Sequence, residues 1–216
     1  MSAKPRYECE ELSAMNDAAL SAQKLGIRKA AHLARKAQPD KEAVSLAITD
    51  RVLQMPEYVA ARYVMWYVDA RDEARTRQAI PGEVAGDKAI VVPYCADGEL
   101  KLFRLESMDE LEVGMYQILE PREPLREIAA KKIDINQLDL ILVPGLGFDA
   151  RGGRIGHGKG YYDRLLEHAK PETLLVSLAF ECQMFDDVPM QRHDIFMDKV
   201  VTEKCVYEGI GRRGTS

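Results

Sequence analysis

The spacing of apolar and polar residues predicts two helices near the start of the chain. Residues 13–36 are rich in Ala, Leu, Lys and Arg and contain no Pro, a composition that favours one long helix. Pro39 interrupts this stretch, and Asp40 is placed to cap a second helix that ends near Gln54. Residues 1–12 are mostly polar and are expected to form a flexible lead-in. One face of the second helix carries Val44, Ile48, Val52 and Met55.

Apolar runs farther along the chain predict the strands of a sheet. Residues 58–68 and 138–143 are dense in apolar side chains, which is typical of strands buried on both faces. Strands that alternate with helices indicate a mainly parallel sheet with helices on both faces. We therefore expect one α/β domain over residues 13–216, with the N-terminal helical pair packed on it. The other expected strands are residues 88–93, 99–105, 173–180 and a short one near Val200, and the other expected helices are residues 72–80, ended by Pro81, and residues 160–170.

The composition is that of a soluble globular protein, with 46% hydrophobic and 30% charged residues among 216. The net charge of −5 argues against a nucleic-acid partner, whose usual mark is a basic patch and a high pI. No stretch approaches the roughly 20 apolar residues that span a bilayer, and the N-terminus lacks a secretory signal. The cysteines are scattered without a CxxC pair, which predicts neither zinc nor disulfides and fits the cytoplasm. They are Cys9, Cys95, Cys182 and Cys205.

A glycine-rich loop after the strand at 138–143 is the clearest chemical signal. Five of the nine residues from 152 to 160 are glycine, so backbone amides can approach an anion closely. Arg154 and Lys159 add positive charge, and a helix that begins near Gly160 directs its N-terminus to the same place. Because ligands of open α/β sheets bind beyond the carboxyl ends of the strands, this loop predicts a phosphate site.

Three other interpretations of the loop fit less well. A plain connection would normally span about 2–6 residues. The segment 145–150 satisfies a relaxed dinucleotide fingerprint, but no helix begins directly after it. The segment 153–159 fits the front of a P-loop, yet Gly160 stands where a Ser or Thr would bind magnesium. Asp163 is the natural substitute, because magnesium prefers hard oxygen ligands.

The same region carries an extended family signature. It reads Pro-Gly-Leu-Gly-Phe-Asp at 144–149, Gly-Arg-Ile-Gly at 153–156 and Gly-Lys-Gly-Tyr-Tyr-Asp at 158–163. This signature resembles that of the 5-formyltetrahydrofolate cyclo-ligases, also called methenyltetrahydrofolate synthetases. The resemblance extends over residues 20–205, including a Lys-xxx-Arg pair near the N-terminus.

The resemblance implies a Rossmann-like α/β fold and a reaction that depends on ATP and Mg²⁺. In that reaction, ATP phosphorylates the formyl oxygen of 5-formyltetrahydrofolate. The N10 amine then attacks the activated carbon, and loss of phosphate gives 5,10-methenyltetrahydrofolate. The implied partners are ATP and a folate with or without a polyglutamate tail, but neither nucleic acid nor a membrane, and the implied state is a monomer.

The resemblance also assigns site residues by position. Lys159, Arg154 and Tyr161 are the catalytic candidates, and Asp163 and Asp194 are the metal candidates. The ATP candidates are Lys24, Arg28, Arg154, Ile155, Gly156, His157, Gly158, Lys159, Gly160, Tyr161 and Tyr162. The folate candidates are Val68, Glu73, His157, Gly158, Lys159, Gly160 and Tyr161.

Two positions depart from the family pattern and leave alternatives open. Arg75 stands where the family usually has an acid, and Gln117 stands where it usually has a glycine. A divergent relative that binds nucleotide but has lost or changed the folate reaction is therefore the main alternative. A non-catalytic nucleotide-binding or RNA-associated module is a third, which the acidic pI disfavours. Trp66, on an expected strand, is assigned to the core.

Overall fold

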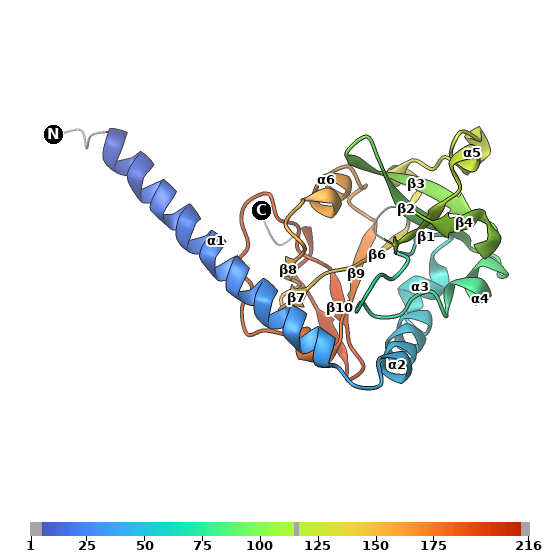
Figure 1. The fold of residues 1–216 in the computed structure, drawn as a ribbon, viewed down its shortest axis with the longest axis horizontal. Coiled ribbons are helices and arrows are strands. Elements are labelled where there is room, and N and C mark those ends of the chain that lie inside the picture. The colour runs from blue at the N-terminus through green and yellow to red at the C-terminus, as the bar shows by residue number, and fades with distance from the viewer. Residues whose placement is uncertain (1–5, 115–116, 213–216) are drawn as a thin grey trace.

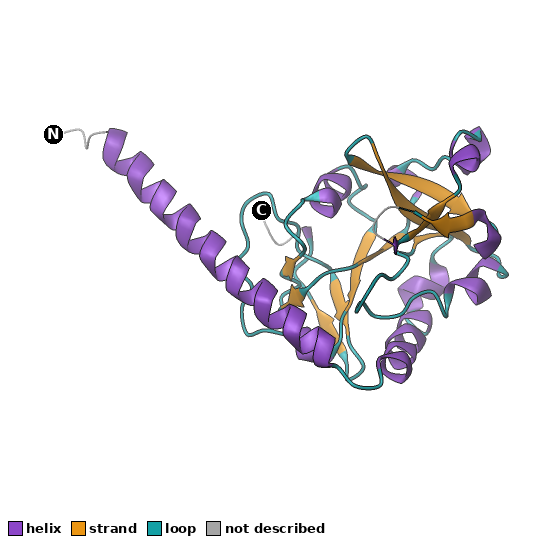
Figure 2. Ribbon diagram, in the orientation of Figure 1, coloured by secondary structure: helices purple, strands orange, loops and turns teal. Residues whose placement is uncertain are grey.

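The computed structural model describes residues 6–114 and 117–212, with side chains from residue 18 onward, and its centre is a seven-stranded sheet (Figures 1 and 2). The strand order is β11-β10-β9-β6-β1-β2-β3. The five inner strands pair in parallel, and the outer strands β3 and β11 pair antiparallel. The mainly parallel sheet predicted from the sequence is therefore confirmed.

The strands of the main sheet are short. They are β1 (Tyr63–Met65), β2 (Ala89–Ala96), β3 (Glu99–Leu105), β6 (Leu140–Val143), β9 (Leu174–Leu178), β10 (Lys199–Val201) and β11 (Val206–Glu208). Two small antiparallel pairs accompany it, β4 (Leu111–Val113) with β5 (Leu119–Pro121) and β7 (Gly147–Phe148) with β8 (Arg154–Ile155).

The helices lie around this sheet. They are α1 (Arg6–Ala37), α2 (Lys41–Leu53), α3 (Pro56–Ala60), α4 (Ile80–Val84), α5 (Glu123–Arg126) and α6 (Tyr161–Glu167). Short 3-10 turns occur at Met108–Glu110, Ala129–Lys131, Ile135–Gln137 and Glu181–Gln183.

Alternate residues of the central strands face opposite sides of the sheet, as strand geometry requires. On β6, Leu140 and Leu142 belong to the core cluster that α2 and α3 cover. Ile141 and Val143 point the other way, into the cluster that α6 covers. All four are at most 1% exposed, so the sheet is buried on both faces.

Helix α1 lies beside the glycine-rich hairpin, and its first half projects beyond the sheet (Figure 1). Its second half contacts β7, β8 and Glu181–Gln183. Ala31 and Arg35 are buried in this contact, whereas Leu33 is 67% exposed. Helix α1 therefore forms a wall over the hairpin.

Several predicted boundaries were wrong. The first helix begins at Arg6 and not near residue 13, so residues 6–12 of the expected lead-in are helical, whereas residues 1–5 lie outside the described residues. The flexibility of the lead-in stays a prediction. Asp40 precedes α2 with a left-handed φ of 46° and makes no side-chain cap. The expected strand 58–68 begins with α3, because Pro56 favours the first turn of a helix. Trp66 is fully buried, as expected for a core residue.

The expected helix at 72–80 is also wrong. Residues 69–79 form an irregular loop, and α4 begins at Ile80. Pro81, taken as the end of a helix, instead lies in the first turn of α4, where its missing amide costs nothing. In the described parts of the chain, no helix combines the length and apolar character that a membrane span requires.

The packing of β6 predicts a large difference between two leucines. Leu142→Ala should lower the free energy of unfolding by about 2–5 kcal/mol, because it leaves a cavity in a filled core. Leu33→Ala, on the exposed side of α1, should change it by no more than about 0.5 kcal/mol. Denaturant unfolding of both variants measures these values, and equal losses would contradict the assigned core.

Candidate active site

A cleft of about 950 Å³ lies at the carboxyl ends of β1, β2 and β6. Its other walls come from the second half of α1, the residues after β8 and the segment around Asp194. This is the position at which open α/β sheets bind their ligands. Every residue predicted for ATP, folate or metal lines it: Lys24, Arg28, Val68, Glu73, Arg154, Ile155, Gly156, His157, Gly158, Lys159, Gly160, Tyr161, Tyr162, Asp163 and Asp194.

The buried carboxylate of Asp149 shapes the glycine-rich hairpin. Asp149 is 0% exposed and accepts hydrogen bonds from the amides of Arg151 at 2.9 Å, Gly153 at 2.8 Å and Val188 at 2.9 Å. These bonds close the turn between β7 and β8 and attach it to the segment after Glu181–Gln183. The hairpin therefore holds Arg154, the first residue of β8, in a fixed position at the cleft.

The glycines of the loop serve two purposes. At Gly152, with φ of 87°, a Cβ would lie 2.2 Å from the carbonyl oxygen of Met197, so packing requires glycine there. Gly160 lines the cleft with φ of 65° and precedes α6. A Ser or Thr, as in a P-loop, would be strained in this conformation. Helix α6 ends at Glu167, short of the expected residue 170.

Two ion pairs join the predicted ATP residues to the predicted metal residues. Arg154 Nη2 lies 2.6 Å from Asp163 Oδ1, and their side chains are 3% and 25% exposed. Lys24 Nζ pairs with Asp194 and also donates to Gln191 Oε1 at 3.0 Å. The Lys24 and Asp194 side chains are 10% and 13% exposed. These two ion pairs thus connect four segments of the chain.

Further positive charges lie beside the glycine-rich loop at Gly156 and His157. Arg28 Nε donates to the carbonyl oxygen of Gly156 at 3.0 Å, which ties the loop to α1. His157 is next in the chain. Partial burial, and then the positive charges of Arg35 and Arg71, lowers the pKa of His157 below the usual 6.5. The imidazole is therefore neutral at pH 7.

The two tyrosines at the start of α6 differ in their packing. Tyr162 packs against the core, and its ring lies 5.9 Å from the Arg154 guanidinium. Burial raises the pKa of Tyr162, so it stays protonated. The ring of Tyr161 lies 6.0 Å from Lys159 Nζ and 5.2 Å from the Arg164 guanidinium.

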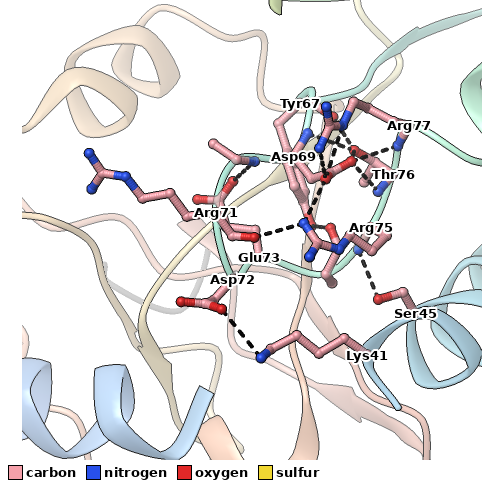
Figure 3. Close-up of polar contacts among 12 residues, drawn as sticks. Lys41, Ser45, Tyr67, Asp69, Arg71, Asp72, Glu73, Arg75, Thr76 and Arg77 are labelled. Carbon is pink, nitrogen blue, oxygen red and sulfur yellow. Dashed lines mark hydrogen bonds and ion pairs between the residues drawn. The ribbon is translucent and has the colours of Figure 1, made fainter. Parts of the chain in front are cut away.

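The opposite wall of the cleft carries the predicted folate residues. Val68, after β1, is 7% exposed. Glu73 is half-buried, and its Oε2 accepts the amide of Ala70 at 2.9 Å (Figure 3). Burial raises the pKa of Glu73, against the lowering effect of this hydrogen bond and of Arg35.

The two departures from the family pattern have structural counterparts. Arg75 pairs with Asp69 beside Glu73 (Figure 3). Gln117 has φ of 62°, in the left-handed region that favours glycine. A glycine would therefore suit this backbone better than the glutamine present.

Several residues of the cleft were not predicted. Arg35 is 2% exposed, and its Nη1 donates to the carbonyl oxygen of Gly145 at 3.3 Å. Its spacing gave a usable signal, because Lys24, Arg28 and Arg35 are four and seven apart and share one helix face. Others that line the cleft are Arg71, Tyr94, Glu120, Arg164 and Gln191.

No group of three or more His, Cys, Asp or Glu side chains is arranged for a metal in the described residues. Asp163 and Asp194 are the two predicted metal ligands that line the cleft, and each is bound to a cation of the protein. Magnesium, however, commonly needs only one or two carboxylates besides substrate phosphates. The donor set therefore fits a metal that arrives with a phosphorylated ligand.

A cationic glycine-rich loop at the carboxyl edge of a parallel sheet defines an α/β protein of the class that binds phosphorylated ligands. The model of the 5-formyltetrahydrofolate cyclo-ligase family matches residues 20–203. Because this match covers most of the sequence, the chain belongs to the 5-formyltetrahydrofolate cyclo-ligase family.

Individual relatives agree with this placement. The chain is 29% identical to a 5-formyltetrahydrofolate cyclo-ligase of Mus musculus, over 74% of this chain and 82% of the mouse protein. It is 30% identical to that of Saccharomyces cerevisiae, over 74% of this chain and 84% of the yeast protein. The solved structure of Aquifex aeolicus 5,10-methenyltetrahydrofolate synthetase matches with a TM-score of 0.75 and 31% identity, over 86% of this chain and 92% of that one.

The cations around His157 lead to a prediction that does not depend on activity. His157 should titrate below 6.5 in an NMR pH series, with His157→Gln used to identify its signal. Arg71→Gln should raise this pKa, because removal of a nearby positive charge favours the protonated ring. Arg77→Gln, which removes a cation that does not line the cleft, should leave it unchanged. A pKa at or above 6.5 in the unaltered protein would contradict the described surroundings.

Proposed function

We propose that this chain catalyses the ATP-dependent cyclisation of 5-formyltetrahydrofolate to 5,10-methenyltetrahydrofolate, with release of ADP and phosphate. The observation that carries the proposal is the single cleft in which a cationic glycine-rich loop faces Glu73 and Val68. One wall suits a triphosphate and the other suits the donor groups of a pterin. Family membership supports the same reaction.

This reaction requires charged side chains in the cleft more than it requires a nucleophilic side chain. The formyl oxygen attacks the γ-phosphorus of ATP, and ADP leaves. The N10 lone pair then attacks the formyl carbon, the carbon–oxygen bond breaks with departure of phosphate, and N10 loses its proton. Phosphoryl transfer requires mainly positioning and neutralisation of charge. Arg154 and Lys159 supply that charge, while Tyr161 is proposed to orient the folate beside them.

Mg²⁺, when bound, would neutralise part of the charge of the phosphates. Asp163 and Asp194 would hold it. Each must first give up its present partner, Arg154 or Lys24. We infer that Arg154 and Lys24 pair with phosphate oxygens when the nucleotide binds. Both carboxylates would then be available to bind the metal.

Glu73 is proposed to accept hydrogen bonds from the pterin amine and ring nitrogen. This role needs the carboxylate form, and burial raises the pKa of Glu73 above the usual glutamate value. Folate binding through Glu73 should therefore weaken on acidification earlier than an exposed glutamate would allow. Action as a monomer, location in the cytoplasm and acceptance of a polyglutamate tail stay predictions from the sequence.

The reaction is tested by the absorbance of methenyltetrahydrofolate after mixing the protein with 5-formyltetrahydrofolate, ATP and Mg²⁺. We expect product only when all three are present, with one ADP formed for each product. Lys159→Ala and Asp163→Ala should stay folded and lose turnover, because each removes a charge beside the transferred group. Lys170→Ala is the matched control, since its ammonium pairs with Asp139 away from the cleft.

Unchanged rates in Lys159→Ala or Asp163→Ala would refute the roles assigned to them. Nucleotide binding by the unaltered protein without any product would instead favour the divergent relative that Arg75 and Gln117 leave open.

The exchange of ion pairs predicts that ATP and Mg²⁺ bind cooperatively. Without metal, ATP must leave the carboxylates of Asp163 and Asp194 unpaired beside its phosphates, which is costly. We expect Mg²⁺ to tighten ATP binding by about 5- to 150-fold. In the Asp163→Asn/Asp194→Asn variant this gain should shrink, mainly because metal-free ATP binds more tightly.

Calorimetric titration of ATP, with Mg²⁺ or with a chelator, measures this gain without any turnover. Glu167→Gln, an exposed acid of α6 that also lines the cleft, is the control and should keep the full gain. The same metal dependence in the double variant as in the unaltered protein would rule out the exchange.

A further inference from the structure

The loop after β1 is built around the buried carboxylate of Asp69 (Figure 3). The Asp69 side chain is 0% exposed, and its Oδ1 accepts the amides of Thr76 at 3.0 Å and Arg77 at 2.8 Å. The Thr76 hydroxyl, in turn, donates to the carbonyl oxygen of Tyr67 at 2.6 Å. These bonds draw residues 69 and 76 together, so the intervening residues form a closed turn.

Arg75 fastens this turn from within. Its Nη1 lies 3.4 Å from Asp69 Oδ2 and donates to the carbonyl oxygen of Arg71 at 2.7 Å. Its amide donates to Ser45 Oγ on α2 at 2.8 Å, and Asp72 pairs with Lys41 of the same helix at 3.3 Å. The turn is therefore attached to a helix that packs on the sheet.

The backbone that these contacts hold is strained at Arg71. Arg71 has φ of 55°, a region that a non-glycine residue occupies only when its surroundings impose it, and such residues cluster at ligand sites. Its side chain lines the cleft and points away from the Asp69 cluster (Figure 3). Among the described residues, no carboxylate lies within ion-pair distance of its guanidinium.

We propose that Arg71 is a specificity-determining residue that pairs with the carboxylate-bearing glutamyl tail of the folate, and that Arg75 and Asp69 are positioning residues that hold it there. This inference rests on the proposed function. It also gives a role to Arg75, which departs from the family pattern.

Two anions could attract Arg71, the glutamyl carboxylates of the folate or the phosphates of ATP. Arg71 shares its turn with Glu73, the residue proposed to bind the pterin, so it lies on the folate side of the cleft. The phosphates already have cations on the facing wall, namely Lys24, Arg28 and Lys159. The carboxylates are therefore the better match for Arg71.

A cycle that combines a protein change with a substrate change tests the pairing. The unaltered protein and Arg71→Gln are each assayed with 5-formyltetrahydrofolate and with the methylamide of 5-formyltetrahydropteroate, which lacks the glutamate and carries no carboxylate. Arg71→Gln should raise KM for the folate about tenfold, the value of one charge-assisted hydrogen bond, with kcat and the KM of ATP unchanged. With the methylamide, the substitution should change KM less than about twofold, because the charge partner is already missing.

Arg75→Gln and Arg77→Gln form a matched pair for the positioning role. Both guanidiniums contact Asp69, but only Arg75 also binds the Arg71 carbonyl oxygen. Arg75→Gln should therefore raise KM for the folate and leave KM for the methylamide unchanged, whereas Arg77→Gln should leave both KM values near those of the unaltered protein. Equal effects of the two substitutions would overturn the positioning role.

An equal rise in KM for both substrates in Arg71→Gln, or a rise in the KM of ATP alone, would overturn the tail assignment. The second result would assign Arg71 to phosphate. These failures differ from failure of the proposed function, in which the unaltered protein would cyclise neither substrate.

Discussion

The pairing of cations with carboxylates across the cleft is the interaction on which the site depends. Lys24 and Asp194 are 170 residues apart in the sequence, yet their side chains meet in a setting from which water is largely excluded. Arg154 and Asp163 form a second pair in the same cleft. An unpaired charge in such surroundings is costly, so these two pairs stabilise the arrangement of the cleft. A ligand that separates these pairs must therefore offer negative charge to Lys24 and Arg154 and positive charge to Asp194 and Asp163. A complex of a metal ion with a triphosphate offers both.

Two buried aspartates hold the backbone segments that carry these charged side chains in one conformation. Asp149 closes the hairpin that delivers Arg154, and Asp69 closes the turn that carries Arg71 and Glu73. Each carboxylate binds backbone amides that would otherwise lack partners in an irregular segment. Both turns follow strands whose carboxyl ends meet at one edge of the sheet. The position of the site thus comes from the parallel topology, and its precision comes from local hydrogen bonds to these two carboxylates.

The sequence predicted those elements whose structure is determined by residues that are close together in the chain. The strand at β6 and the glycine-rich loop were visible because a continuous apolar run and a glycine cluster need no tertiary context. Residues 72–76 of the turn were wrongly assigned to a helix expected at 72–80, because the shape of the turn depends on the Asp69 carboxylate and not on periodicity. The ion pair of Lys24 with Asp194 could not be inferred, since it joins segments that only folding brings together. Family resemblance named both residues without revealing that they bind each other.

The central claim is that the cleft brings the γ-phosphate of ATP against the formyl oxygen of the folate. It is tested most directly with 5-formyltetrahydrofolate labelled with ¹⁸O in the formyl group, in one reaction with the protein, ATP and Mg²⁺. We predict that the released inorganic phosphate carries the ¹⁸O label. Conversion to methenyltetrahydrofolate with unlabelled phosphate would contradict it.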